Sequence, residues 1–195
     1  VLDGYTANPG DISWESWNEL AEVTVYDRTA PSQLLERAKD ADALLTNKVI
    51  ISRETMQHLP SLKYIGVLAT GYNVVDIHAA HELGITVTNI PAYSTNSVAQ
   101  MVFAHLLNIT QQVAAHSADV VAGRWRDCED FCFRKCSLLE LDGMSIGIVG
   151  FGNTGSATAR IAHSFGMRVF AFSTKPQDQL PDYVSRVDSL DQLFS

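Results

Sequence analysis

The chain has 195 residues, of which 46% are hydrophobic and 18% charged, and its formal net charge at pH 7 is −8. This composition excludes general disorder, and no apolar run reaches the roughly 18–20 residues that cross a bilayer. The acidic excess argues against nucleic acid and anionic membranes as partners. Three cysteines, an odd number, favour a reducing and therefore cytoplasmic setting over a disulfide framework. No signal peptide is recognisable at the first residues.

The first half of the chain alternates short apolar runs with helical patterns, which indicates a parallel sheet covered on both faces. Asp76 is expected to cap the last helix, and Gly84 to end it in the left-handed conformation. We therefore expect a five-stranded flavodoxin-like domain over residues 1–95. Its predicted strands are Val1–Leu2, Val23–Tyr26, Ala43–Leu45, Tyr64–Val67 and Thr86–Asn89, and its predicted helices are Trp14–Leu20, Ser32–Ala38, Ser52–Leu59 and Asp76–Leu83.

A second α/β pattern follows over residues 96–195. It opens with a long amphipathic helix over Asn96–Ala122 and a charged, irregular segment over Gly123–Ser137. Strands are then predicted at Ser145–Val149, Val169–Phe172 and Val184–Val187, with a helix between Gly155 and Gly166 and a capped helix start at Ser189. This is one half of a Rossmann domain, a doubly wound parallel sheet, so Ser145–Val149 should have an unpaired edge within the chain.

The strongest local motif is the glycine sequence Gly150-Phe151-Gly152-Asn153-Thr154-Gly155. It follows a predicted strand and opens a helix, which is the context that a dinucleotide-binding loop requires. Gly150 allows the tight turn, Gly152 lets the backbone approach a pyrophosphate, and Gly155 lets helix and strand pack closely. The free N–H groups at Asn153 and Thr154 face the anion. The alternative is a glycine-rich turn that binds no ligand.

The residues after the second strand of this domain bear on the choice between NAD and NADP. An NAD site has an acidic residue there, whereas this chain has Ser173, Thr174 and Lys175. Neutral hydroxyls and a cation suit a 2′-phosphate, because no carboxylate repels it. NADP is therefore favoured over NAD. The alternative is that Lys175 is only solvated and NAD is accepted without the acidic contact.

Two loops of the first domain are candidates for binding an acidic substrate. Thr70 and Gly71 follow a predicted strand, where backbone N–H groups can point at a carboxylate. Lys48 follows the preceding strand and could neutralise an anion, although a lone lysine is more often only solvated. No metal site is predicted, because neither the histidine pair His78 and His81 nor the three cysteines have the spacing of a known zinc site.

Together these features resemble the D-isomer-specific 2-hydroxyacid dehydrogenases, and within that family the branch of glycerate dehydrogenases, or hydroxypyruvate reductases. The resemblance covers nearly the whole chain and is more specific than the glycine loop alone. The matching stretches are Leu2–Tyr5, Asn8–Gly10, Thr46–Lys48, Ala69–Asp76, Asn89–Thr95, Ser97–Gln100, Gly123–Trp125 and Leu141–Gly143, which runs into the glycine loop.

The resemblance implies reversible hydride transfer between NAD(P)H and C2 of a small 2-keto or 2-hydroxy acid, with hydroxypyruvate and D-glycerate as the expected pair. It places the substrate carboxylate on the amides of Thr70 and Gly71, with Thr70 also near the cofactor and Lys48 at the substrate entrance. It further implies a homodimer built through residues 96–137. Ser173 stands where the family usually has an acid.

The family's catalytic Arg, acid and His are not matched by any residue of this chain, so no catalytic residue is assigned. A keto acid that accepts a hydride needs a proton donor and charge stabilisation. We therefore expect a C-terminally truncated enzyme whose 195 residues are inactive alone. The alternative function is a non-catalytic NAD(P)-sensing or protein-binding relative on the same fold.

Overall fold

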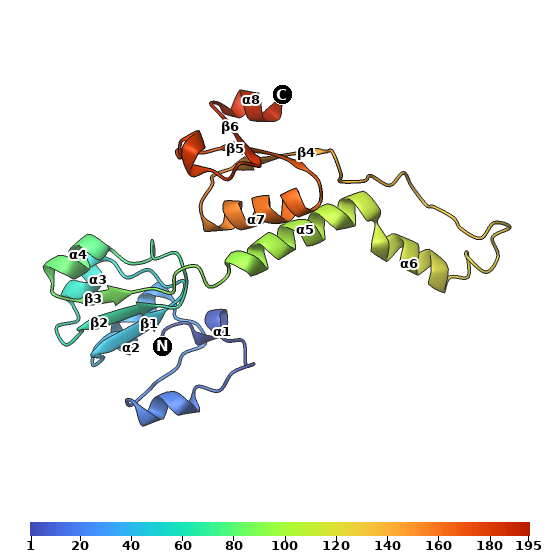
Figure 1. Ribbon diagram of the computed structural model, residues 1–195. Helices are drawn as coiled ribbons and strands as arrows, with labels where there is room; N and C mark the ends of the chain where they lie inside the picture. The colour runs from blue at the N-terminus through green and yellow to red at the C-terminus, as the bar shows by residue number, and fades with distance from the viewer. The chain divides into compact units, whose positions relative to one another are not determined.

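The computed structural model describes all 195 residues, and the chain divides into two compact units, Val1–Tyr93 and Ser94–Ser195. Each unit is built on its own parallel sheet (Figure 1). The predicted α/β class, a flavodoxin-like unit followed by an incomplete Rossmann sheet, is confirmed. No helix is both long enough and apolar enough to cross a membrane.

The first unit contains three regular strands, β1 (Ala43–Thr46), β2 (Tyr64–Val67) and β3 (Thr86–Thr88), in the order β1-β2-β3. All pairs are parallel, with Leu44 opposite Ile65 and Ile65 opposite Val87. The strands are connected through helices, as parallel pairing requires. These helices are η2 (Pro31–Gln33, 3₁₀) and α2 (Leu34–Ala38) before β1, α3 (Arg53–Gln57) before β2 and α4 (Ile77–Glu82) before β3.

Two of the five predicted strands are extended segments rather than regular strands. The Leu2 N–H donates to the Leu45 carbonyl at 2.9 Å, and the Tyr26 N–H donates to the Val1 carbonyl at 2.9 Å. The ladder toward β1 stops because the Asp3 carboxylate, rather than a main-chain carbonyl, accepts the next amide, that of Asn47, at 2.9 Å. The segments still lie in the order 23–26, 1–3, β1, β2, β3, which is that of a flavodoxin-like sheet.

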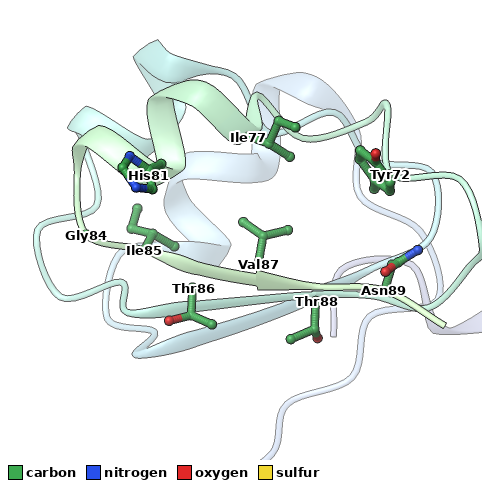
Figure 2. Close-up of a pocket in the computed structure, with 9 residues that line it drawn as sticks. All are labelled: Tyr72, Ile77, His81, Gly84, Ile85, Thr86, Val87, Thr88 and Asn89. Atoms are coloured by element: carbon green, nitrogen blue, oxygen red, sulfur yellow. The ribbon is translucent and has the colours of Figure 1, made fainter. Parts of the chain in front are cut away.

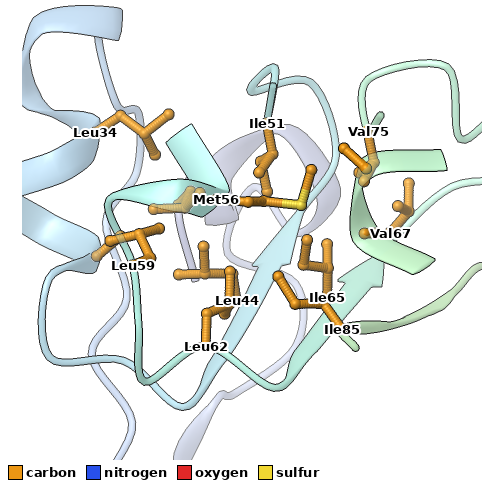
Figure 3. Packing of buried hydrophobic residues seen from close by; sticks show 14 of the residues in the cluster. Leu34, Leu44, Ile51, Met56, Leu59, Leu62, Ile65, Val67, Val75 and Ile85 are labelled. Atoms are coloured by element: carbon orange, nitrogen blue, oxygen red, sulfur yellow. The ribbon is translucent and has the colours of Figure 1, made fainter. Parts of the chain in front are cut away.

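The core of the first unit lies on one face of its sheet. Figure 3 shows Met56 extending from α3 into the space near Ile51 and Ile65. The opposite face carries Thr86 and Thr88 of the edge strand β3, which are exposed, so the predicted cover on both faces is absent at β3. Successive right-handed crossovers that advance in the same direction place their helices on the same face. The core residues are Leu2, Leu34, Ala38, Leu44, Ile51, Met56, Leu59, Leu62, Ile65, Val67, Ala69, Val75, Ala79, Ala80 and Ile85.

The helix ends of the first unit follow from residues close to them in the sequence. The Asp76 carboxylate accepts the Ala79 N–H at 2.9 Å, and Gly84 has φ +71°, so the start and end of α4 are confirmed. The helix predicted over Trp14–Leu20 is a 3₁₀ helix, η1 (Glu15–Glu19). A single turn, α1 (Gly4–Ala7), precedes it.

The helix predicted over Asn96–Ala122 is broken into α5 (Thr95–Gln111) and α6 (Val113–Val121). Gln112, between them, has φ +45°. The Leu139 N–H donates to the Thr110 carbonyl at 3.2 Å, and the Gln111 side chain donates to the Leu139 carbonyl at 2.6 Å. A segment distant in sequence therefore occupies a carbonyl that would otherwise continue the helix.

The second sheet contains β4 (Ser145–Val149), β5 (Arg168–Phe172) and β6 (Val184–Val187), all parallel and in that order. β4 pairs only with β5, so the predicted unpaired edge is confirmed. Ile148 faces α7 (Asn153–Ser164), whereas Gly147 faces Leu193 of α8 (Leu190–Phe194). A 3₁₀ turn, η3 (Gln177–Gln179), lies between β5 and β6.

Candidate functional site

The glycine loop connects β4 to α7 and has the geometry that the sequence predicts. Gly150 has φ +89°, and its N–H donates to the Phe172 carbonyl at 2.8 Å, which ties the loop to the end of β5. A Cβ added at Gly155 would lie 2.2 Å from the Gly150 carbonyl oxygen. Close packing of the helix against the turn therefore requires Gly155.

The space in front of this loop is open, and the start of α7 lacks a cap. A Cβ at Gly150 or Gly152 would meet nothing within 4 Å, and no side chain accepts a hydrogen bond from the first turn of α7. No acidic residue lies in that turn. Free N–H groups at Asn153 and Thr154 and the positive end of the helix dipole can therefore receive an anion. These residues fit the diphosphate of a dinucleotide.

We expect Gly155→Ala to destabilise the second unit by about 1–3 kcal/mol, because the added methyl group overlaps a main-chain oxygen and the helix must shift. Thermal unfolding followed by circular dichroism checks this result. Ser156→Ala, in the same helix turn, is the matched control and should change the melting temperature little. An unchanged melting temperature in Gly155→Ala would contradict the packing role.

The end of β5 brings together the hydroxyls and the cation that the sequence singles out. The Lys175 N–H donates to the Ser173 hydroxyl at 3.1 Å, and the Lys175 ammonium lies 5.9 Å from the centre of the Phe151 ring in the glycine loop. Ser173, Thr174 and Lys175 thus form a turn whose cation lies beside the glycine loop.

Arg186 also belongs to this group, although the sequence motifs do not predict it. It belongs to β6, and its Nε donates to the Ser173 carbonyl at 3.4 Å. Its guanidinium also pairs with Asp188. The Gln177 side chain holds this part of β6 in position, because its amide N–H donates to the Val184 carbonyl and its oxygen accepts the Arg186 N–H. The predicted parallel pairing of these two strands could have indicated this contact, because it brings the carboxyl ends of β5 and β6 to the same edge of the sheet.

In the first unit, Thr70 and Gly71 lie in the loop after β2, at the carboxyl end of the sheet. The Thr70 hydroxyl donates to the Ile90 carbonyl at 3.0 Å, and the Asn89 side chain donates to the Thr70 carbonyl at 2.8 Å. The loop is therefore anchored through its side chain and its carbonyl. Main-chain N–H groups of Thr70 and Gly71 remain available to a carboxylate.

A pocket of about 630 Å³ lies beside β3, between this strand and α4 (Figure 2). It includes Tyr72 from the Thr70–Gly71 loop and Asn89 from the loop that anchors it, but no lysine or arginine. Lys48 lies elsewhere, in a second pocket that it shares with Arg28 and that neither Thr70 nor Gly71 lines. The structure therefore does not place Lys48 in the same pocket as the Thr70–Gly71 loop.

Comparison with known proteins identifies the family. Residues 6–180 match the model described as D-isomer specific 2-hydroxyacid dehydrogenase, catalytic domain. The chain belongs to this dehydrogenase family. The resemblance drawn from the sequence motifs is thereby confirmed.

Relatives within the dehydrogenase family include the hydroxypyruvate reductase of Blautia hydrogenotrophica, which is 44% identical over 100% of this chain and 62% of its own length. The glycerate dehydrogenase of Methylorubrum extorquens is 35% identical over 88% of this chain and 55% of its own. Among solved structures, the TT0316 protein of Thermus thermophilus superposes with a TM-score of 0.75 at 32% identity, covering 92% of this chain and 57% of that one. The chain thus spans little more than half the length of these relatives.

Proposed function

We propose that this chain is part of an NAD(P)-dependent oxidoreductase that acts on a small 2-keto or 2-hydroxy acid, with hydroxypyruvate and D-glycerate as the substrate pair. The observation that carries the proposal is the uncapped start of α7 beneath open space at Gly150 and Gly152. A bound nicotinamide would supply or accept the hydride at C2 of the acid. The names of the hydroxypyruvate reductase and glycerate dehydrogenase relatives support the substrate pair.

The residues that bind have distinct roles in this proposal. Gly150, Gly152, Asn153, Thr154 and Gly155 hold the diphosphate through main-chain N–H groups. In the other unit, the N–H groups of Thr70 and Gly71 hold the substrate carboxylate, and Thr70 also approaches the cofactor. Lys48, which the resemblance places at the substrate entrance, lines a different pocket from this loop. None of the 195 residues is assigned as proton donor, so we expect the isolated chain to bind without turnover.

The direct test is a fluorescence titration of the chain with NADPH. We expect saturable binding, because the glycine loop leaves open space in front of the free N–H groups at the start of α7. Hydroxypyruvate added to the NADPH-saturated chain should change the nucleotide's affinity or its emission. A chain that leaves NADPH emission unchanged at every concentration would contradict the proposal, whereas binding of NADPH without any response to a 2-keto acid would favour a nucleotide-sensing protein.

NADPH should bind more tightly than NADH, because Ser173, Thr174, Lys175 and Arg186 offer hydroxyls and cations to a 2′-phosphate. A guanidinium has five N–H donors, so Arg186 can bind a phosphate while paired with Asp188. Arg186→Gln should weaken NADPH binding by roughly 10-fold or more, the size of one charge-assisted hydrogen bond, and leave NADH unaffected.

The matched control for this prediction is Arg160→Gln, which removes the same charge from an exposed position on α7. Titrations of both variants with both nucleotides give the comparison. Equal losses of NADPH and NADH affinity in Arg186→Gln would show that Arg186 only supports the loop, and the preference for NADP would then lose its basis.

A homodimer is the expected assembly, formed through α5, α6 and the segment 123–137. This part of the second unit exposes large apolar side chains, including Val121 at 86% and Phe131 at 89%, which a second copy of the chain would bury. The segment is fastened to α6 through Asp119, which pairs with Lys135 and Arg124; both partners lower the pKa of this carboxyl, Lys135 more strongly. The three free cysteines in the same segment suit a cytoplasmic protein.

One chain has a mass of 21.4 kDa, and we expect sedimentation of the wild type to give twice this value. Val121→Asp should give the mass of the monomer, because a dimer of the variant would bury a charge in its interface. Ile12→Asp is the matched control, because Ile12 is exposed in the other unit and its replacement should leave the dimer intact. A wild-type chain that stays monomeric at high concentration would contradict the assembly.

A further inference from the structure

The irregular part of the chain after α6 is fastened to that helix at one residue, Lys135. Its main-chain N–H donates to Nε2 of His116 at 3.1 Å, and its ammonium pairs with Asp119 at 3.1 Å. No other hydrogen bond or ion pair joins residues 128–137 to α6. The position of this segment beside the helix therefore depends on these two contacts of Lys135.

The hydrogen bonds of His116 determine which ring nitrogen carries the proton. Nδ1 lies 3.0 Å from the Gln112 carbonyl oxygen, which can only accept a hydrogen bond, so Nδ1 carries a hydrogen. Nε2 accepts the Lys135 N–H, so Nε2 carries none. The two contacts together therefore require the neutral imidazole with its proton on Nδ1.

A proton added at Nε2 would remove the acceptor of the Lys135 N–H, because the nitrogen would become a second donor. Imidazole is the side chain that commonly changes its charge between pH 8 and pH 5, and the main-chain amide of Lys135 does not change over this range. Protonation of His116 and its contact with Lys135 exclude each other. Acidification therefore shifts the equilibrium toward the detached segment.

The charged groups around His116 keep the other contact of Lys135 intact over the same range of pH. Asp119, on the same helix, pairs with Lys135 from the segment and with Arg124 from the turn after α6. Lys135, and then Arg124, lower the pKa of the Asp119 carboxyl, so it remains charged at pH 5. The Phe133 ring, 6.3 Å from the His116 ring, holds the Arg124 guanidinium at 4.8 Å. His116 is thus the group that makes the attachment sensitive to pH.

We propose that His116 is a pH-sensitive fastening, which holds residues 128–137 against α6 at pH 8 and releases them toward pH 5. The part that is released contains Phe131, which is exposed, and Phe133, which is half-buried beside α6. The inference uses contacts within one chain, and it depends neither on the nucleotide site nor on the homodimer.

NMR spectra of the ¹⁵N-labelled chain at pH 8 and pH 5 test the proposal. At pH 8 we expect the His116 proton on Nδ1, and backbone order parameters in residues 128–137 near the value of about 0.85 that is typical of rigid backbone. At pH 5 we expect both ring nitrogens to be protonated and the order parameters of these residues to fall below about 0.6. Unchanged amide signals from α7 and the second sheet verify that the unit is folded at both pH values.

Two variants of His116 separate its protonation from other effects of acid. In His116→Gln the side-chain oxygen can accept the Lys135 N–H and does not titrate, so we expect the segment to stay ordered at both pH values. His116→Phe keeps a ring but has no acceptor, so we expect the segment to be mobile at both. His105→Gln, which replaces an exposed histidine on α5, is the matched control and should respond to pH as the wild type does.

The proposal is overturned by order parameters that are the same at pH 8 and pH 5, or by an equal fall in the wild type and in His116→Gln. An ordered segment in His116→Phe at pH 8 would also overturn it, because the hydrogen bond would then not be needed. So would a His116 proton on Nε2 at pH 8, since the Lys135 N–H could not then donate to that nitrogen.

Discussion

Gly152→Val should lower the affinity for NADPH at least about 100-fold, or about 2.7 kcal/mol, while the free energy of unfolding changes by less than about 1 kcal/mol. Gly152 has φ −82° and ψ −159°, an extended conformation that valine adopts readily. A Cβ at this position meets nothing within 4 Å, so the folded chain does not require glycine there. The valine side chain would instead occupy the space in front of the N–H groups of Asn153 and Thr154.

Fluorescence titration and chemical denaturation of the same preparations separate the two effects. Gly143→Ala provides the opposite control: Gly143 has φ +72°, so the variant should lose about 1–2 kcal/mol of stability yet bind NADPH as the wild type does. If Gly152→Val binds NADPH normally, the diphosphate does not lie on the glycine loop. If it fails to fold, the open space at this position has been misjudged.

Asp3→Ala should destabilise the first unit by about 2–6 kcal/mol, because two main-chain donors lose their partner and each buried unsatisfied donor costs about 1–3 kcal/mol. Asp3 is buried, and its carboxylate accepts the N–H groups of Asn47 and Lys48 and the Thr6 hydroxyl. The contact also joins the first residues of the chain to the end of β1, so we expect the extended segment 1–3 to detach.

Denaturant unfolding monitored by circular dichroism measures this loss, with Asp76→Ala as the matched control. Asp76 caps α4 through one hydrogen bond to the Ala79 N–H at 2.9 Å, so its loss should cost only about 1 kcal/mol. Equal costs for the two variants would contradict the assignment of Asp3 as the link between the N-terminal segment and β1.

The sequence predicts the features that depend on a few consecutive residues. The Asp76 cap, the left-handed Gly84 and the strand–glycine–helix order at Gly150–Gly155 follow from local conformational preferences. The break at Gln112 could not be predicted, because Leu139, far along the chain, provides the hydrogen bond that accompanies it. The exposure of Thr86 and Thr88 could not be predicted either, because it depends on which face of the sheet each helix covers.

The residues of the candidate sites also differ in whether they are neighbours in the sequence or are brought together by the fold. The glycine loop is contiguous, so its residues could be found together. Arg186 comes near Ser173 only because β6 pairs with β5, and Arg28 comes near Lys48 only because their two loops meet at one end of the first sheet. Such pairs depend on strand order and register, which hydrophobic periodicity does not determine.

A crystal structure of the chain with NADPH tests the central claim most directly. We predict that the diphosphate lies against the main chain of Gly152, Asn153 and Thr154 at the start of α7, with the 2′-phosphate beside Lys175 and Arg186. A diphosphate bound anywhere else in the chain would contradict the account.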